Sequence, residues 1–358
     1  MERRKSNRVT VGGIHIGGGA PISIQSMTNT DTHDLEATYR QVVALRDAGC
    51  DVVRITAPDL ESVSTFAALK EREVGIPLVA DVHFNYRIAV ALADVGVDKI
   101  RINPGNIGSD EKVKAVVDAC RRNNVPIRIG VNSGSVEKSI LAKYGRPTPE
   151  ALVESALYHA SLLERYDFTD IVLSVKASTT TDMIAANRLL AVRTSYPLHL
   201  GVTEAGGGTA AIVKSSVGIG TLLAEGIGDT VRVSLTADPV EEIYAAREIL
   251  SALGMLSRPA LDIVSCPTCG RTEIDLIGLA DSFRRRVREE GLDGLPLRVA
   301  LMGCVVNGPG EARECDLGIA GGHGEGLLFR HGEIIRKVPE CELVETLISE
   351  MKKLKTED

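Results

Sequence analysis

Short apolar runs recur along the first two thirds of the chain, and each is followed by a stretch whose apolar positions have helical spacing. The runs are rich in Val and Ile and end in polar or glycine residues, which predicts strands. They are 22–28, 51–57, 77–83, 99–104, 126–132, 170–178, 197–205 and 230–237. Eight strand–helix units predict an α/β fold of the (β/α)8 TIM-barrel class, because an open doubly wound sheet usually has fewer strands.

The last third has a different pattern. A Gly- and Pro-containing linker at 254–262 precedes two apolar strands that carry cysteines, the helix DLIGLADSFRRRVREE, the hairpin-like run GEGLLFRHGEIIRKV and a final helix. This pattern predicts a small α+β domain. We therefore divide the chain into a barrel domain at 1–256 and a smaller domain at 257–358. Near the start, GGIHIGGG at 12–19 predicts a hairpin turn.

One connection is unusually long. Residues 133–150 follow the fifth predicted strand, on the face where barrel enzymes bind substrate. Loops of this length are either lids or plain surface excursions, and the sequence favours neither.

Composition removes several classes of protein. The net charge is −7, so no overall basic field is available for nucleic acid. No apolar run is long enough to span a membrane, and no apolar segment follows the basic N-terminus as in a signal peptide. Seven cysteines, an odd count, argue against a secreted disulfide scaffold and favour a reduced cytoplasmic protein.

Charged and polar side chains gather on the predicted barrel strands. The cations within strands are Arg54, Arg101, Arg128, Lys176 and Arg232, and the other polar groups in or at the ends of strands are Asp81, His83, Asn132, Glu204 and Ser234. Such residues converge on the mouth of a barrel. Any one cation could pair with a buried acid, but five cations face only two obvious acids, Asp81 and Glu204. We therefore predict a small anionic ligand carrying phosphate or diphosphate.

A glycine run after Glu204 leads into a helix at 201–215, so backbone N–H groups there could hold a phosphate, although any tight turn has a similar sequence. A second candidate centre contains Cys266, Cys269 and Cys304, the last beside a Gly/Pro-rich loop. The spacing fits an iron–sulfur cluster or a zinc site with Cys315 as fourth ligand, and fits thiol redox chemistry less well.

The motifs resemble those of the 4-hydroxy-3-methylbut-2-en-1-yl diphosphate synthase family of the non-mevalonate isoprenoid pathway, in its short bacterial form. The similar stretches run in order along nearly the whole chain: IQSMTNTDT (24–32), VADVHFNYRIA (79–89), KIRINPGNIG (99–108), RIGVNSGSVEK (128–138), SVKAS (174–178), HLGVTEAGG (199–207), EGIGDTVRVSLTADPVEEI (225–243), CPTCGRT (266–272) and GCVVNGPGEA (303–312).

This resemblance implies reductive ring opening of 2-C-methyl-D-erythritol 2,4-cyclodiphosphate to (E)-4-hydroxy-3-methylbut-2-enyl diphosphate, with electrons from ferredoxin or flavodoxin. It implies a [4Fe–4S] cluster held by Cys266, Cys269, Cys304 and Glu311, and it removes Cys315 from the ligand set. The five strand cations would clamp the diphosphate. Asp81, Asn132, Ser234 and Asn307 would orient or contact it, Glu204 would be the acid, and His83 and His199 would be supporting or purely structural groups.

Two rival classes remain at this point. One is a phosphate-binding barrel lyase or transferase with a structural zinc, and the other is a non-catalytic cluster protein that carries electrons. The chain length adds a prediction of oligomeric state. The eighth barrel helix, at about 239–253, runs away from the mouth, and a linker of about nine residues reaches only ~30 Å. We therefore predict a homodimer in which each cluster domain closes the partner's barrel.

Overall fold

The computed structural model describes residues 2–257, 260–305 and 313–357. The chain divides into two compact units, Met1–Met255 and Leu256–Asp358. Each unit is described by itself.

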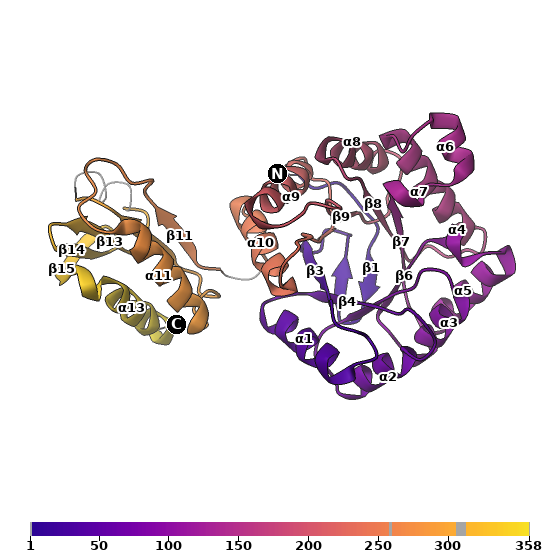
Figure 1. The fold of residues 1–358 in the computed structure, drawn as a ribbon, viewed down its shortest axis with the longest axis horizontal. Helices are drawn as coiled ribbons and strands as arrows, with labels where there is room; N and C mark the ends of the chain where they lie inside the picture. Colours follow the sequence, from indigo (N-terminus) through magenta and orange to yellow (C-terminus); the bar gives the residue numbers. More distant parts are fainter. Residues whose placement is uncertain (1, 258–259, 306–312, 358) are drawn as a thin grey trace. The chain divides into compact units, whose positions relative to one another are not determined.

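The first unit is built on eight parallel strands, and it confirms the predicted barrel (Figure 1). Their order is β8-β7-β6-β5-β4-β3-β10-β9, and a bridge between Leu173 and Leu198 joins the two ends. The strands are β3 (Ser23–Met27), β4 (Val52–Thr56), β5 (Leu78–Asp81), β6 (Lys99–Ile102), β7 (Ile127–Asn132), β8 (Ile171–Lys176), β9 (His199–Leu200) and β10 (Thr230–Val231).

The last two strands are much shorter than their apolar runs predict. After β9, Glu204 has a φ of 55° and Gly206 a φ of 92°, so the backbone leaves the extended conformation. After β10, the amide of Leu235 donates to the Glu242 carboxylate and that of Thr236 donates to the Gly206 carbonyl. These amides are therefore not available to a neighbouring strand.

Helices surround the strands, as Figure 1 shows. The main ones are α1 (Leu35–Asp47), α2 (Val63–Glu71), α3 (Tyr86–Val95), α5 (Asp110–Arg122), α7 (Pro149–Glu164), α8 (Thr180–Ala191), α9 (Gly208–Ala224) and α10 (Pro239–Ala252). Short helices α4 (Pro104–Ile107), η1 (Ser133–Ser135) and α6 (Lys138–Tyr144) lie in two of the connections. Side-chain caps start several helices: Thr148 accepts from Ala151 N and Asp238 from Val240 N, each just before a proline at the first turn.

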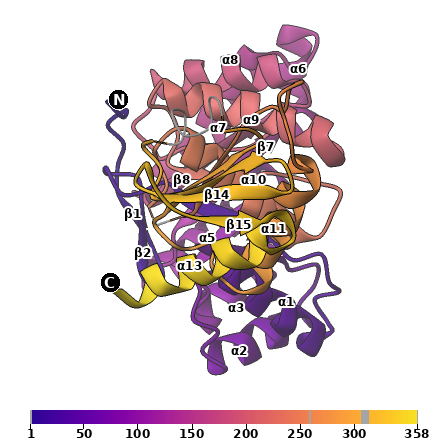
Figure 2. The ribbon, with the colours of Figure 1, turned by 90° about the vertical axis from the view of Figure 1, so that its left-hand side faces the viewer.

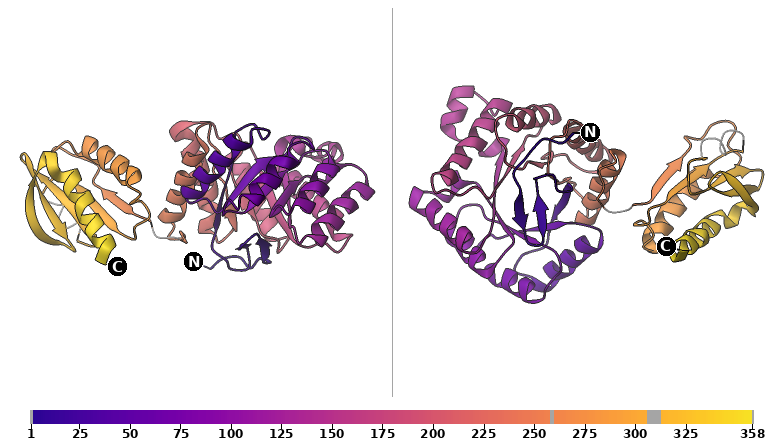
Figure 3. Two further views of the ribbon diagram at one scale, coloured as in Figure 1. Left: turned by 90° about the horizontal axis from the view of Figure 1, so that it is seen from below. Right: turned by 180° about the vertical axis from the view of Figure 1, so that it is seen from behind.

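A hairpin precedes the barrel, as predicted from the glycine-rich start. It consists of β1 (Val9–Val11) and β2 (Ile14–Ile16), which turn at Gly12 with a φ of 56°. Val9, Val11 and Ile16 are buried in one cluster with Val172 of β8. Figure 3 shows the hairpin at one end of the barrel. It covers the amino-terminal end of the barrel, opposite the strands' carboxyl ends.

The second unit has a five-stranded sheet in the order β11-β12-β13-β14-β15. Its elements are β11 (Asp262–Ser265), α11 (Leu276–Glu289), β12 (Arg298–Met302), β13 (Leu317–Gly322), β14 (Glu325–Arg330), β15 (Glu333–Pro339), η2 (Glu340–Glu342) and α13 (Leu343–Glu357). β11, β12 and β13 are parallel, and β13 to β15 are antiparallel. Helices α11 and α13 pack on the sheet through one apolar core that includes Phe283, Leu301 and Leu347 (Figure 2).

In the part of the chain that the structure describes, no helix is long and apolar enough to cross a membrane.

Candidate active site

Six cations line the inside of the barrel. Successive side chains of a strand point to opposite faces, so Lys99 and Arg101 of β6 share one face. The register places Arg101 opposite both Asp81 of β5 and Arg128 of β7. The full set is Arg54, Lys99, Arg101, Arg128, Lys176 and Arg232. Lys99 is not among the cations predicted from the sequence, although its position two residues before Arg101 places it on the same face of β6.

Asp81 forms the first of two acidic anchors for these cations. Its carboxylate lies 3.0 Å from Arg101 Nη1 and 3.7 Å from Arg54 Nε. Burial alone would raise the pKa of Asp81, but Arg54 and Arg101 outweigh burial and hold that pKa below its usual value. Arg101 also contacts His83 Nε2 at 3.2 Å. Asp81 is thus an ionised group that fixes two arginines.

Glu242 forms the second anchor, and it corrects the acid count made from sequence. Glu242, on α10, is buried and lies 3.1 Å from Arg232 Nη2. It also accepts hydrogen bonds from Ser26 Oγ at 2.7 Å and Leu235 N at 3.1 Å. Glu204, which we had counted as an acid facing the cations, is exposed and instead accepts a hydrogen bond from Ser178 Oγ at 2.8 Å. A glutamate in the first turn of a helix gives no sequence signal of such a role.

The other three cations have no acidic partner. Within the described residues, no carboxylate lies within ion-pair distance of Lys99, Arg128 or Lys176, although all three are buried. Arg128 donates from Nη1 to Gln25 Oε1 at 3.0 Å. Burial, Arg232, Arg54 and Arg128 lower the pKa of Lys176 well below its ordinary value. Within the described residues, Arg128 therefore keeps a positive charge that no carboxylate balances.

Two glycines on the strands make room for these long side chains. A Cβ on Gly130 of β7 would lie 2.6 Å from Arg101 Nε. A Cβ on Gly201, just after β9, would lie 2.7 Å from the Arg232 carbonyl oxygen and 3.0 Å from Lys176 Nζ. Larger residues at either position would displace a cation.

The remaining predicted barrel residues lie at the carboxyl ends of strands. Asn132 ends β7 opposite Lys176 of β8, and its backbone N donates to Ser135 Oγ at 3.0 Å. Ser234 follows β10 and is half-buried. Glu204 follows β9 with a left-handed backbone that is rare for a non-glycine residue. All three therefore belong to the mouth end of the barrel.

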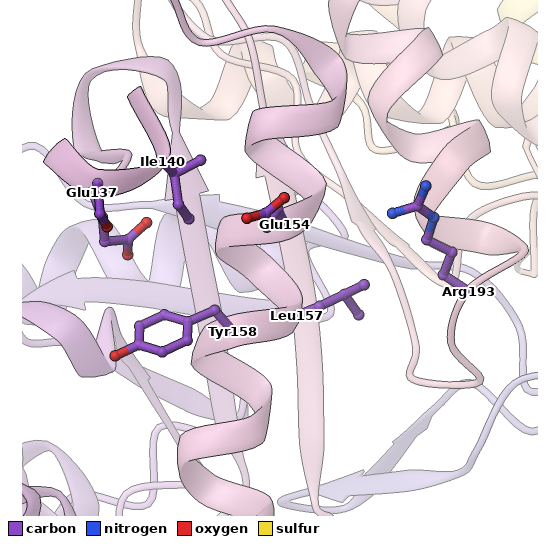
Figure 4. A pocket seen from close by; sticks show the side chains of 7 residues that line it. Glu137, Ile140, Glu154, Leu157, Tyr158 and Arg193 are labelled. Atoms are coloured by element: carbon purple, nitrogen blue, oxygen red, sulfur yellow. The ribbon is translucent and has the colours of Figure 1, made fainter. Parts of the chain in front are cut away.

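The long connection after β7 packs against α7. Its Glu137 contacts His159 Nε2 of α7, and Glu154 of α7 accepts from Lys143 Nζ at 2.6 Å and Tyr144 Oη at 2.7 Å. His159 is fully buried, and its Nδ1 accepts from Gly105 N of α4 at 3.2 Å. Figure 4 shows the pocket of about 470 Å³ beside α6 and α7. The connection is thus held by one contact to a buried histidine and two more exposed contacts, and it is joined through His159 to the loop after β6.

Three cysteines of the second unit, Cys266, Cys269 and Cys304, lie in the loops that follow β11 and β12. Cys266 follows β11, Cys304 follows β12, and these two strands are adjacent and parallel. Gly303 N donates to Cys266 Sγ at 3.3 Å, which joins the two loops. Cys269 is exposed, and hydrogen bonds from Arg271 lower the pKa of its thiol.

Cys315 lies at the other end of the strands, beside the start of β12. It precedes β13, where Asp316 N donates to the carbonyl of Arg298, the first residue of β12. It is buried with Ala300, Met302 and Phe329. A zinc site that combines Cys304 with Cys315 is therefore incompatible with the sheet.

Within the described residues, no group of three or more His, Cys, Asp or Glu side chains is gathered closely enough to hold a metal ion. Two predicted site residues, Asn307 and Glu311, lie outside the described residues.

Comparison with family models settles the family. Residues 6–247 match the GcpE TIM-barrel domain, and residues 262–353 match the GcpE protein C-terminal domain. The chain belongs to the GcpE family. Curated relatives named 4-hydroxy-3-methylbut-2-en-1-yl diphosphate synthase (flavodoxin) include one from Clostridium perfringens, 57% identical over 97% of this chain and 98% of the relative. Another, from Geobacter sulfurreducens, is 53% identical over 99% of each chain.

Among solved structures, this GcpE family chain is similar to a type I 3-dehydroquinate dehydratase from Clostridium difficile. The TM-score is 0.51 with 14% identity, over 69% of this chain and 98% of that chain. At this identity the likeness concerns the barrel fold alone.

Proposed function

We propose that this GcpE family chain converts 2-C-methyl-D-erythritol 2,4-cyclodiphosphate to (E)-4-hydroxy-3-methylbut-2-enyl diphosphate. The reaction consumes two electrons and two protons and releases one water, while the carbon–oxygen bond that closes the ring is broken. The observation that carries this proposal is the cationic barrel interior, in which three buried cations have no acidic partner among the residues that the structure describes. The names of the full-length relatives give the same activity.

The barrel side chains bind the diphosphate. Arg54, Arg101 and Arg232 are held in place by Asp81 and Glu242, while Arg128 and Lys176 keep their donors free of carboxylates. Arginine forks match phosphate oxygens in pairs, so this arrangement suits a diphosphate. Asn132 and Ser234, at the same end of the barrel, orient the ligand. The N–H groups at the start of α9 add further donors, because no side chain caps this helix. Asp81 acts indirectly, because it holds Arg54 and Arg101 in position.

Glu204 is the proposed acid beside the departing hydroxyl group. Its carboxylate is held by Ser178 Oγ, and its left-handed backbone carries strain of the kind that persists at functional sites. Glu204→Gln should therefore abolish turnover while leaving diphosphate binding intact.

The second unit would hold a [4Fe–4S] cluster. The loops that follow β11 and β12 carry three thiols, those of Cys266, Cys269 and Cys304, and this arrangement fits a thiolate-bound cluster. The hydrogen bond from Gly303 N to Cys266 Sγ is of the kind that tunes cluster sulfurs. Glu311 would be the fourth ligand and Asn307 a substrate contact. A bound cluster would supply the electrons singly and a Lewis-acidic iron, and flavodoxin or ferredoxin would be the electron donor.

The test uses anaerobically prepared, full-length protein. We expect iron and sulfide in about equal amounts, conversion of the cyclic diphosphate with reduced flavodoxin, and no zinc requirement. Single changes of Cys266, Cys269 or Cys304 to Ser should each remove iron, whereas Cys315→Ser should retain it. Zinc without sulfide, or equal iron loss with Cys315→Ser, would contradict the proposal.

The homodimer with exchanged cluster units is also part of this proposal. Mixing the Glu204→Gln and Cys266→Ser proteins tests it, because exchange of subunits would create one site with an intact barrel and an intact cluster. Partial recovery of activity is expected. No recovery despite demonstrated exchange, or a fully active monomer in sedimentation, would contradict it.

A further inference from the structure

A cluster of buried nitrogen atoms lies inside the barrel below the proposed diphosphate clamp. We define the barrel floor as Gln25, Lys99, Arg128 and His199, from β3, β6, β7 and β9. In the described part of the chain, Gln25 Nε2, Lys99 Nζ, Arg128 Nε and His199 Nε2 are buried without a hydrogen-bond partner. Each unpaired buried nitrogen costs free energy unless something else meets it. Four together point to a function rather than to packing.

Lys99 is the deepest cation of the floor. It begins β6, two residues before Arg101, and therefore lies one layer further from the mouth. Lys99 and His199 are fully buried, and Arg128 is 1% exposed. The β1–β2 hairpin packs Val9, Val11 and Ile16 against Val172 at the other end of the barrel. The hairpin therefore packs on the end of the barrel opposite the mouth.

The charges that face Lys99 come from the surrounding strands and are cationic or neutral. Arg54 of β4 and Arg128 of β7 both disfavour its ammonium form, and His199 and Gln25 are neutral floor groups. Lys176 of β8 and Lys99 both lower the pKa of His199, so their charges act at the same place in the barrel. The nearby carboxylate of Asp81 is already occupied by Arg54 and Arg101. A buried charge without a partner costs several kcal/mol.

The chemistry of the side chains decides which cation can adapt. An arginine keeps its proton in proteins, so Arg128 cannot lose its charge. A lysine can lose its proton, and burial, Arg128 and Arg54 lower the pKa of Lys99 well below its ordinary value. Lys176 is slightly exposed at the mouth end, whereas Lys99 Nζ has no contact with solvent or a partner.

We propose that Lys99 is a proton-linked anion site: its amine is neutral in the ligand-free barrel and takes up one proton from solvent when a diphosphate binds above it. The inference rests on the proposed function only for the identity of the anion. No other bond changes, and the ammonium then faces the diphosphate together with Arg128.

The proposed reaction gives this site a purpose. A cyclic diphosphate has one ionised oxygen on each phosphate, and ring opening adds a further ionised oxygen. Fixed arginines match only one of these two charge states. An amine that gains a proton follows the ligand from the cyclic to the open form, and so it favours the open diphosphate.

The sign of the pH dependence follows from linkage. The pKa of Lys99 is low in the free protein and rises when the anion binds, so binding takes up a proton between the two pKa values. Within that window, diphosphate affinity increases as the pH falls. Below the pKa of the free protein, Lys99 is charged in both states and its contribution to the pH dependence disappears.

The experiment is isothermal titration of the full-length, anaerobic protein with inorganic diphosphate. Titrations in buffers of different ionisation enthalpy give the number of protons taken up. We compare the wild-type protein with Lys99→Met and with a matched control, Lys114→Met, whose side chain is exposed on α5. Differences between variants cancel the protonation of the ligand itself. Wild type and Lys114→Met should take up roughly one proton more than Lys99→Met, which should also bind about tenfold to a hundredfold more weakly.

A melting measurement separates this role from a structural one. Met fills the place of the lysine without its buried, unpaired amine, so the ligand-free Lys99→Met protein should melt at or above the wild-type temperature. A lower melting temperature, or equal proton uptake by Lys99→Met and wild type, would overturn the inference and leave the proposed function standing. If the wild type fails to bind inorganic diphosphate, both the inference and the diphosphate site fall.

Discussion

The six cations of the barrel form two groups that share one cavity lining and differ in how their charge is balanced. Arg54, Arg101 and Arg232 reach carboxylates of the protein, namely Asp81 and Glu242. Lys99, Arg128 and Lys176 do not reach any carboxylate in the described residues. The first group can be built and held by the fold alone, whereas the second depends on a ligand for its charge balance.

The difference separates stability from binding within one set of side chains. Removing one partner of a buried ion pair leaves the other charge buried without a partner, so substitutions in the paired group should lower the free energy of unfolding. Removing a buried cationic side chain that has no carboxylate partner should not lower the free energy of unfolding, and it should weaken anion binding instead. The two groups should therefore respond to substitution in opposite ways.

The largest expected effect belongs to the paired group. Glu242→Gln removes the charge that Arg232 contacts and disturbs the acceptor of Ser26 Oγ and Leu235 N. We expect a loss of about 3–5 kcal/mol in the free energy of unfolding, measured by denaturant titration. Glu241→Gln, on the exposed neighbour in α10, is the control and should change stability little. Equal stability of the two variants would erase the distinction between the groups.

Lys176→Met tests the unpaired group directly. The affinity for inorganic diphosphate should fall about tenfold to a hundredfold, the range for a hydrogen bond to a charged group. The free energy of unfolding without ligand should stay equal or rise, because a buried amine without a carboxylate partner is removed. The comparison fails if this variant loses stability as Glu242→Gln does.

A glycine substitution probes how closely the paired group is packed. A Cβ at Gly130 meets Arg101 Nε at 2.6 Å, so Gly130→Ala should cost about 1–3 kcal/mol and raise KM by moving Arg101. Gly134→Ala is a matched control, since its Cβ meets no atom within 4 Å. Unchanged KM in both variants would show that Arg101 has room to move.

The smallest effect near neutral pH is expected for Asp81, whose contribution to stability should change only at low pH. The pKa of Asp81 is held below its ordinary value, so its contribution to stability is complete above the unfolded-state pKa of about 3.9 and is lost as the pH falls through the folded-state value. Unfolding free energies at decreasing pH should therefore fall more steeply for the wild type than for Asp81→Asn. Parallel curves would mean that Asp81 is not ionised in the barrel.

Much of the fold was accessible from the sequence. The periodic apolar runs predicted all eight barrel strands, because burial imposes a two-residue or helical period on each element. The glycines at 12–19 predicted the hairpin at the start. In the second unit the sequence predicted two strands and a hairpin but not β13, the central strand of the five. The predicted ends of β9 and β10 lie too far along the chain. There, Glu204 and Gly206 take left-handed backbones, and Glu242 captures the Leu235 amide, which are local events that periodicity does not encode.

The candidate site was accessible in part. Strand position was enough to gather Arg54, Arg101 and Arg128, because alternate residues of adjacent strands meet on one face. The sequence did not show which carboxylates pair with the cations, because Glu242 reaches Arg232 from a helix and Glu204 accepts a hydrogen bond from Ser178 instead. The roles of Cys266, Cys269, Cys304, Asn307 and Glu311 remain predictions that the experiments above address.

The hairpin of Val9–Val11 and Ile14–Ile16 has a consequence for the order of events during turnover. The hairpin packs against Val172 at the end of the barrel away from the mouth, so a diphosphate bound as proposed lies on the mouth side of Lys99. We therefore expect protonation of Lys99 to accompany ligand entry. Rapid mixing should reveal proton uptake no slower than diphosphate binding, and the uptake should become slow once the mouth is occupied.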